Sequence, residues 1–283
     1  MASLSSSFTL ANQVSIPCLG FGTFMTPSSE IGEKSVLAAL KVGYRLIDTA
    51  SAYENEGMIG KALQESGLPR EEVFLTTKLW NADQGFDATL TAFRKSLKKL
   101  GTDYLDLYLI HWPVAAGHRK DWPARVRETW AAFEKLYQDG KVRAIGVCNF
   151  LPRHFEALLS GANVPPMVNQ IEFNPFCQQK EVTDFCRAHG ILVEAWGPMQ
   201  RGKVFRNPAI QEIAAQYGKD PGQICLKWEL QQGILPLPKS VHPDRIQSNA
   251  DVFDFELSDE TMAQLSALSE KDSYTWDPHT SAF

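Results

Sequence analysis

The sequence lacks the patterns that would place it at a membrane. In its 283 residues, no apolar run approaches the roughly 20 residues that a membrane-spanning helix needs. The first residues, MASLSSSFTLANQ, have neither the basic start nor the apolar centre of a secretory signal peptide. We therefore expect a soluble, cytoplasmic protein without a membrane partner.

The chain also lacks the cysteine and histidine spacings of disulfide and metal sites. Its five cysteines are an odd number without a C-x-x-C pair, which is typical of reduced thiols in a cytosol. No two of its six histidines form an H-x-H or H-E-x-x-H pair, so we expect no bound metal. Four of them are expected to face solvent: His118, His154, His189 and His279.

An excess of positive charge is missing too. The net charge is −5, and acidic and basic residues are interspersed. The longest basic cluster, RKSLKK (94–99), fits the exposed face of an amphipathic helix. Nucleic acid is therefore not expected as a partner.

What the sequence does contain is a regular alternation of strand-like and helix-like segments. Eight units is the number that a closed parallel barrel needs, and barrels of about 250 residues commonly form one domain. No linker or low-complexity stretch interrupts the chain. We therefore predict an α/β fold, a (β/α)8 TIM barrel in which residues 1–283 form a single domain. The strand-like apolar runs begin near Cys18, Tyr44, Val73, Tyr104, Val142, Val168, Leu192 and Ile234.

Additional elements are expected at both ends of this barrel. Residues 8–16 predict a β-hairpin around Ala11-Asn12 that covers the N-terminal end of the barrel. Two extra C-terminal helices, near 243–250 and 258–268, follow the last strand. Helical patterns within the barrel cover 30–42, 55–66, 87–100, 125–138, 152–160, 179–189 and 221–232, the last after an Asp220-Pro221 start signal.

Four polar residues stand at or just beyond the ends of three apolar runs. Asp48 closes YRLID (44–48) and Tyr53 follows it, Lys78 lies near the end of VFLTTKL (73–79), and His111 ends YLDLYLIH (104–111). Because the carboxyl ends of parallel strands share one face of a barrel, these side chains are expected to converge there.

This set of side chains can donate a proton to a carbonyl. A tyrosine with a pKa near 10 is a weak acid, and a nearby lysine lowers that pKa by stabilising the phenolate. Asp48 would keep Lys78 charged and oriented. His111 has two possible roles: holding the carbonyl oxygen with a ring N–H, or relaying a proton if the ring is charged.

Longer motifs around these residues resemble a known family. The segments GYRLIDTASAYENEGMIG (43–60), KLW (78–80), DLYLIHWP (106–113) and LPKSVHPDRIQSN (237–249) resemble the aldo-keto reductase superfamily, with a match from about residue 8 to about residue 270. Within it, the chain is similar to the bacterial and protist reductases grouped with the diketogluconate, glyoxal and prostaglandin F reductases. The resemblance implies an eight-stranded barrel, NADPH as cofactor, and catalytic roles for Asp48, Tyr53, Lys78 and His111.

The resemblance also implies a cofactor site along the later strand ends. Asn149 and Gln170 would hold the nicotinamide carboxamide, and Trp196 would stack on the ring. After the eighth strand, Lys239 and Ser240 precede a helix start near Pro243, an arrangement that favours anion binding, with Arg245 one turn into the helix. We expect the ribose 2′-phosphate there. The remaining implied cofactor contacts are Thr23, Asp48, Cys148, Val241 and Asn249.

Aromatic residues next to the strand-end motifs predict the substrate site. Phe24, Trp80 and Trp112 are expected to form its walls beside His111. The tail carries Tyr274 and Trp276, either of which can close this site. Phe24 stands where many members of the superfamily have tryptophan, and Cys148 stands where serine is frequent.

Together, the four residues and the resemblance imply a protein that reduces aldehydes and some ketones with NADPH while Tyr53 protonates the oxygen. The resemblance also implies a monomer. Methylglyoxal and other dicarbonyls, aromatic aldehydes and keto-sugars are the expected substrate classes. One alternative is a non-catalytic regulatory or binding subunit built on the same barrel, which the intact set of four residues disfavours. A phosphate-binding barrel isomerase or a metal hydrolase is a further alternative, and the latter needs clustered ligands that are missing.

Overall fold

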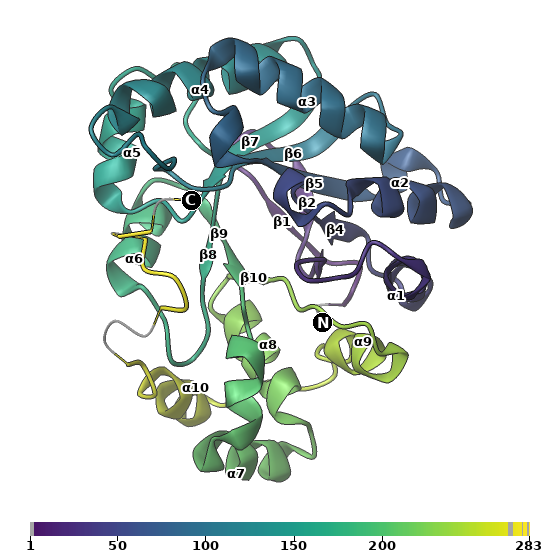
Figure 1. The fold of residues 1–283 in the computed structure, drawn as a ribbon. Coiled ribbons are helices and arrows are strands. Elements are labelled where there is room, and N and C mark those ends of the chain that lie inside the picture. Colours follow the sequence, from purple (N-terminus) through teal and green to yellow (C-terminus); the bar gives the residue numbers. More distant parts are fainter. Residues whose placement is uncertain (1–2, 271–273, 279, 282) are drawn as a thin grey trace.

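Eight parallel strands form the centre of the protein in a computed structural model that describes residues 3–270, 274–278, 280–281 and 283 (Figure 1). Each strand pairs with its neighbours in the sequence, which is the order of a (β/α)8 barrel and confirms the predicted fold class. The strands are β3 (Phe21–Gly22), β4 (Leu46–Asp48), β5 (Phe74–Leu79), β6 (Leu105–Ile110), β7 (Val142–Cys148), β8 (Val168–Glu172), β9 (Leu192–Trp196) and β10 (Leu235–Pro236).

Backbone hydrogen bonds between the first and last strand regions close the barrel. Gly20 N donates to Pro236 O at 3.1 Å, and Gly22 N donates to Pro238 O at 3.0 Å. A Cβ atom at Gly22 would lie 3.0 Å from the Leu237 backbone oxygen, so the close approach of the two segments favours glycine there.

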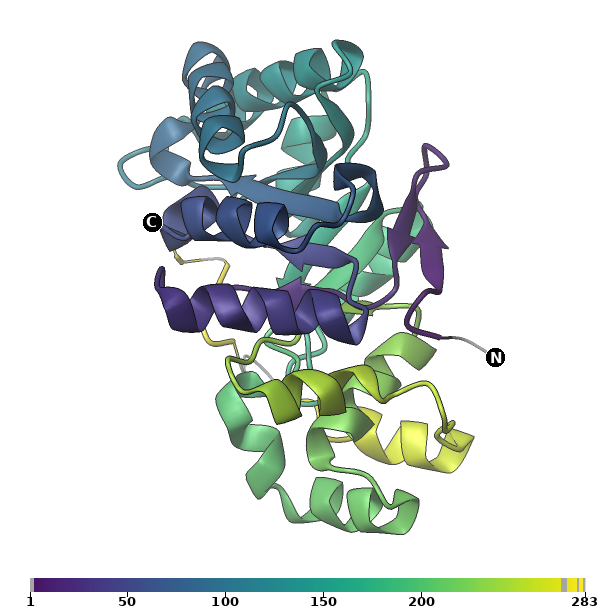
Figure 2. The same ribbon diagram turned by 90° about the vertical axis from the view of Figure 1, so that its right-hand side faces the viewer.

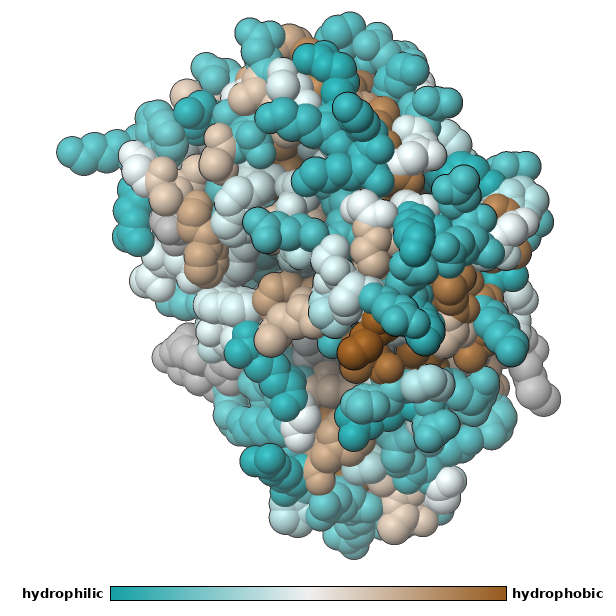
Figure 3. All heavy atoms as spheres, turned by 45° about the vertical axis from the view of Figure 1, so that its right-hand side comes forward, coloured by the Kyte–Doolittle hydropathy of each residue, from teal (hydrophilic) through white to brown (hydrophobic). Residues whose placement is uncertain are grey.

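Burial on both faces explains why the strands could be recognised as apolar runs. All six residues of β6, LDLYLI, are buried, as expected for parallel strands covered by helices. On the outer side of β6, the Tyr108 ring stacks on Phe133 of helix α4 (Trp122–Gln138), with centroids 4.5 Å apart. The surface seen in Figure 3 is mainly hydrophilic, with hydrophobic side chains in small patches, as expected for amphipathic helices around a buried core.

The helices agree with the predicted segments, with one addition. Helix α7 (Pro208–Tyr217) was not predicted, although Asn207-Pro208 is a start signal: the Asn207 side chain accepts a hydrogen bond from Ile210 N. The other helices are α1 (Glu30–Val42), α2 (Glu56–Glu65), α3 (Phe86–Leu100), α4 (Trp122–Gln138), α5 (Pro152–Leu159), α6 (Lys180–Ala188), α8 (Pro221–Gln231), α9 (Pro243–Ala250) and α10 (Asp259–Ser266). Among the described residues there are also four 3-10 segments: η1 (Ser51–Tyr53), η2 (Arg70–Glu72), η3 (Asn81–Asp83) and η4 (Gln200–Arg206).

The predicted hairpin is also present. Strands β1 (Ser7–Thr9) and β2 (Ser15–Pro17) pair antiparallel, and Asn12 Nδ2 donates to Arg143 O at 2.9 Å, near the beginning of β7. The hairpin therefore lies at the N-terminal end of the barrel. In Figure 2, the hairpin and the C-terminal end of the chain lie at opposite sides of the molecule.

One of the histidines expected to face solvent is instead buried. His154 is fully buried at the start of α5, where its Nδ1 accepts a hydrogen bond from Leu151 N at 3.1 Å. A side chain that satisfies a helix N-terminus is shielded because the backbone packs around it. His189 is exposed, His118 is half-buried, and His279 lies outside the described residues.

Helix length and hydropathy also bear on the membrane question. Within the described ranges, no helix combines the length and the apolar character that crossing a membrane requires.

Candidate active site

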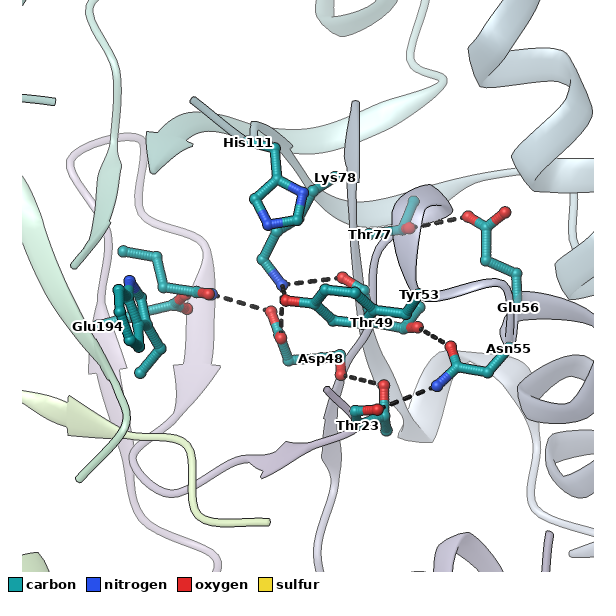
Figure 4. Close-up of polar contacts among 12 residues, drawn as sticks. Thr23, Asp48, Thr49, Tyr53, Asn55, Glu56, Thr77, Lys78, His111 and Glu194 are labelled. Carbon is teal, nitrogen blue, oxygen red and sulfur yellow. Dashed lines mark hydrogen bonds and ion pairs between the residues drawn. The ribbon is translucent and has the colours of Figure 1, made fainter. Parts of the chain in front are cut away.

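A buried lysine contacts two of the other three strand-end residues at the carboxyl end of the barrel. Lys78 Nζ in β5 lies 2.6 Å from Asp48 Oδ1 in β4 and 3.4 Å from the Tyr53 hydroxyl in η1 (Figure 4). It also donates to Thr49 O at 2.9 Å, so its three N–H bonds all have partners. The structure therefore brings Asp48, Tyr53 and Lys78 into one hydrogen-bonded group.

His111 completes the group from the end of β6. Its ring is edge-on to the Tyr53 ring, with centroids 5.6 Å apart. The Asn149 amide Nδ2 donates to His111 O at 3.1 Å, which fixes the backbone that carries the imidazole. Asn149 follows β7 with φ at 60°, a left-handed conformation that asparagine adopts more readily than most residues.

Burial and charge set the protonation states of the tyrosine and the lysine. Burial raises the pKa of Tyr53 to about 12, and the smaller opposing effect of Lys78 does not restore its ordinary value. Lys78 does lower the pKa of Tyr53, as expected, but desolvation raises it by more, so the net shift is upward. Burial disfavours charge on Lys78, but Asp48 and Tyr53 overcome it, so the pKa of Lys78 is raised. At neutral pH, the phenol is protonated and the lysine is charged.

The histidine is neutral in this setting. Burial, followed by the positive charge of Lys78, holds the pKa of His111 well below its ordinary value. Its Nδ1 is buried and has no hydrogen-bond partner among the described residues. A neutral imidazole acts through a ring N–H, which favours the first of the two roles considered for His111.

A second layer of polar residues lies beneath this group. Gln170 Nε2 donates both to Asp48 Oδ2 at 2.9 Å and to Glu194 Oε2 at 2.8 Å. Trp196 Nε1 donates to Asn149 Oδ1 at 2.9 Å. Cys148 is buried at the end of β7, and desolvation raises the pKa of its thiol well above the ordinary value. No motif in the sequence singled out Glu194.

The residues predicted to bind the 2′-phosphate lie together after β10. Lys239 is half-buried, Arg245 is exposed on the first turn of α9, and Ser240 Oγ accepts from His242 N at 3.1 Å. Within the part of the chain that the structure describes, no carboxylate lies within 4.0 Å of either cationic group. Unpaired cations at a helix N-terminus are suited to an anion.

The other predicted cofactor residues have different surroundings. Thr23 is fully buried, and its hydroxyl donates to Asp48 O at 2.8 Å, so its side chain supports the backbone of Asp48. Asn249 is buried in α9, and Val241 is half-buried.

Aromatic side chains surround the tyrosine and the histidine. Phe24 lies 5.1 Å from the Tyr53 ring and Trp80 lies 5.3 Å from the His111 ring, measured between centroids. Trp276 lies 5.9 Å from Phe24 and 5.7 Å from Trp196. Trp276 is therefore the tail residue next to the site, whereas Tyr274 lines a separate cavity beside the starts of α5 and α6.

Phe283 is a neighbour of the site that sequence reasoning missed. Its ring lies 5.0 Å from Trp112 and 6.3 Å from Trp80, and its backbone oxygen accepts from Ala116 N at 2.9 Å and Asn81 Nδ2 at 3.0 Å. An isolated phenylalanine carries no periodic signal that would place it. We call the set Phe24, Trp80, Trp112, Trp276 and Phe283 the aromatic wall.

The fold and this group of residues define a (β/α)8 barrel whose carboxyl end holds a protonated phenol against a buried, charged lysine. Comparison with known proteins gives the family. Residues 18–270 match the model of the Aldo/keto reductase family, and the chain belongs to that family.

Individual relatives agree with this assignment. The chain is 48% identical to glyoxal reductase of Bacillus subtilis, covering 95% of this chain and 94% of that protein. It is 44% identical to 9,11-endoperoxide prostaglandin H2 reductase of Trypanosoma cruzi, covering 95% and 94%. An aldo-keto reductase of Bombyx mori, solved in complex with NADP, superposes with a TM-score of 0.86 at 34% identity, over 95% of this chain and 94% of that one. The superfamily recognised from the sequence motifs is thereby confirmed.

Proposed function

We propose that this protein reduces aldehydes and some ketones to alcohols with NADPH. The observation that carries the proposal is the placement of the Tyr53 hydroxyl 3.4 Å from the ammonium of Lys78, which itself lies 2.6 Å from Asp48. The phenol is protonated at neutral pH, since burial raises the pKa of Tyr53 to about 12. A buried acid beside a fixed cation is suited to protonating a carbonyl oxygen.

The donor and acceptor groups present fit NADPH. The amide oxygen of Gln170 accepts no hydrogen bond from any residue that the structure describes, so it is available to the nicotinamide carboxamide. Trp196 is half-buried at the end of β9, where it can stack on a planar ring. Lys239, Ser240 and Arg245 supply the cationic and hydroxyl groups for the 2′-phosphate. The coenzyme, when bound, supplies the hydride that reduces the carbonyl carbon.

The residues of the chain manage the proton in this scheme. Tyr53 transfers its hydroxyl proton to the developing alkoxide, and Lys78 stabilises the phenolate that remains. Asp48 keeps Lys78 charged and in place. His111 is neutral and orients the carbonyl oxygen of the substrate through a ring N–H. The aromatic wall excludes water from the reacting carbonyl group.

The composition of the aromatic wall supports the substrate class. Its members offer apolar faces, while His111 and Tyr53 supply the polar contacts, which suits a small carbonyl compound or an aromatic aldehyde. The name of the Bacillus subtilis relative, glyoxal reductase, points in the same direction. We propose dicarbonyls such as methylglyoxal, aromatic aldehydes and keto-sugars as the first substrates to test.

The test is the consumption of NADPH, followed at 340 nm, with this panel of carbonyl compounds. We expect turnover with at least one class, and loss of turnover in Tyr53→Phe with the coenzyme still bound. A protein that binds NADPH but reduces no member of the panel would instead support the alternative of a regulatory or binding subunit.

A further inference from the structure

Glu194 is a buried carboxyl group that the proposed reaction does not use. It is only 1% exposed and projects from β9 into the barrel, two residues before Trp196 (Figure 4). Its Oε2 accepts from Gln170, but its Oε1 is buried and has no hydrogen-bond partner among the described residues. An incompletely paired carboxyl group destabilises a fold, so an apolar side chain would serve packing better at this position.

The contacts of Glu194 fix the orientation of a neighbouring amide. Asp48 Oδ2 and Glu194 Oε2 lie 2.9 Å and 2.8 Å from the same atom, Nε2 of Gln170. Only the amide nitrogen has two N–H bonds to give to two oxygens, so this end of the amide is the nitrogen. The amide oxygen of Gln170 must then point away from both carboxyl groups.

We propose that Glu194 is a positioning residue for the coenzyme: with Asp48 it holds both N–H bonds of Gln170, so that Gln170 presents its oxygen to the nicotinamide. This inference rests on the proposed function. Asp48 alone would hold only one N–H bond of Gln170, and the amide group could still rotate about the bond that joins it to the rest of the side chain. The second carboxyl group removes this freedom, which is the role expected of a residue behind a binding group.

The same position gives Glu194 an influence on the charge at the site. The charged or titratable groups that face it are Asp48 from β4, Lys78 from β5 and Cys148 from β7, while β8 and β10 add the neutral Gln170 and Leu235. Burial, followed by the charge of Asp48, raises the pKa of Glu194 to about 8. Glu194 is thus neutral at pH 6 and negative at pH 9. A negative charge behind Gln170 favours the cationic nicotinamide of NADP+ over the neutral ring of NADPH.

A double-mutant cycle tests whether Glu194 acts through Gln170. The variants are Glu194→Leu, Gln170→Ala and the combination, and the readout is the Kd of NADPH from quenching of tryptophan fluorescence. Loss of one neutral hydrogen bond predicts a Kd about 3- to 10-fold higher for Glu194→Leu. The combined variant should bind no more weakly than Gln170→Ala alone. Glu194→Gln retains an acceptor oxygen and should stay within about twofold of the parent at pH 6.

A pH series tests the effect of the charge. In the parent, the ratio of the NADP+ Kd to the NADPH Kd should fall between pH 6 and pH 9, on the order of tenfold. Both coenzymes carry the 2′-phosphate, so ionisations near Lys239 cancel in this ratio. Glu194→Gln, which cannot ionise, should give a flat ratio, and this arm remains informative if Glu194→Leu fails to fold.

Three results would overturn the proposal. They are additive losses in the double variant, a lower melting temperature of Glu194→Leu with an unchanged Kd, and a parent ratio that does not change with pH. The parent protein is measured first: absence of both NADPH binding and carbonyl reduction there would refute the proposed function itself. A parent that binds and reduces, with any of the three results above, would refute only the role of Glu194.

Discussion

Lys78 and Asp48 form an ion pair of 2.6 Å in which the lysine side chain is 1% exposed and the aspartate side chain 6%. Removing water from both charges is costly, and breaking such a pair leaves one charge unpaired in the interior. Loss of Lys78 alone therefore leaves the charge of Asp48 unpaired in the interior, so the melting temperature of a Lys78 variant has to be measured beside its activity.

Tyr53→Phe should abolish most of the proposed activity without affecting coenzyme binding. The ring stays in contact with Phe24 and His111, but the transferable proton is gone, so kcat should fall on the order of 10² to 10⁴. Lys78→Met should cause a similar loss because the phenolate is no longer stabilised. Steady-state kinetics with the NADPH Kd measured in parallel checks both. A Tyr53→Phe variant with more than about a tenth of the parent kcat would show that another group donates the proton.

Arg245→Ala should weaken the binding of NADPH and leave the binding of NADH unchanged. Arg245 has no carboxylate partner among the described residues, and its guanidinium is proposed to contact the 2′-phosphate, which NADH lacks. We expect the NADPH Kd to rise on the order of tenfold, since the residue is exposed and a charge-assisted hydrogen bond is partly screened there. NADH binding should stay the same. Equal weakening toward both coenzymes, measured by fluorescence titration, would mean that Arg245 supports the α9 loop instead.

Phe283→Ala should change substrate preference and not the chemistry. Its ring lies 5.0 Å from Trp112, so its removal enlarges the aromatic wall on that side. The ratio of kcat/KM for bulky against small aldehydes should rise by roughly tenfold, while Phe24→Trp, which fills space beside Tyr53, should lower it. The control is Ile31→Ala on α1, an exposed apolar residue outside this site. A uniform loss for all substrates would indicate a general disturbance of folding.

The burial of Glu229 should make the protein less stable as the pH rises, and a single substitution should remove this effect. Both carboxylate oxygens are buried in α8 without a partner among the described residues, and burial raises the pKa of Glu229 well above its ordinary value. In the unfolded chain, a glutamate ionises near pH 4.3. Below that pH, Glu229 is protonated in both the folded and the unfolded protein, so its full contribution to the free energy of unfolding is present. As the pH rises toward the folded pKa, only the unfolded chain ionises, and this contribution is lost.

Glu229→Gln keeps the shape of the side chain and cannot ionise. The difference in melting temperature between Glu229→Gln and the parent should be several degrees larger at pH 8 than at pH 5. The scale is about 2–4 °C per kcal/mol of unfolding free energy for a protein of this size class. Glu212→Gln, an exposed glutamate on α7, is the matched control and should show no such trend. A difference between Glu229→Gln and the parent that is the same at both pH values would contradict the assignment.

The regular parts of this protein were predictable from its sequence because they repeat. Parallel strands buried on both faces produce apolar runs such as LDLYLI, and their carboxyl ends meet, which is why Asp48 and Lys78 could be placed together. Helix α7 is an additional helix between β9 and α8, outside the regular alternation of one strand and one helix, and its local signal is the Asn207-Pro208 start.

Other features depend on contacts between distant segments, which a local pattern does not contain. The net direction of the Tyr53 pKa depends on how deeply the ring is buried. Phe283 and Trp112 are far apart in the sequence, so no local pattern predicts that their rings come into contact. Glu194 looks like an ordinary polar position in the strand LVEAW, and its role emerges only when Gln170 and Asp48 are seen on the same side.

Two described residues near the C-terminal end of the chain, Thr275 and Phe283, are held by polar contacts to separate parts of the barrel. Thr275 donates from its N and its hydroxyl to Glu172 at 2.6 Å each, and the backbone oxygen of Phe283 is held by Asn81 and Ala116. The hydrogen-bonded group around Lys78 and the neighbouring His111, in contrast, lie on β4, β5, η1 and the end of β6. Substitutions at Trp276 or Phe283 can therefore alter the aromatic wall while the group around Lys78 keeps its contacts. If the proposed function holds, new substrate ranges are then accessible in small steps.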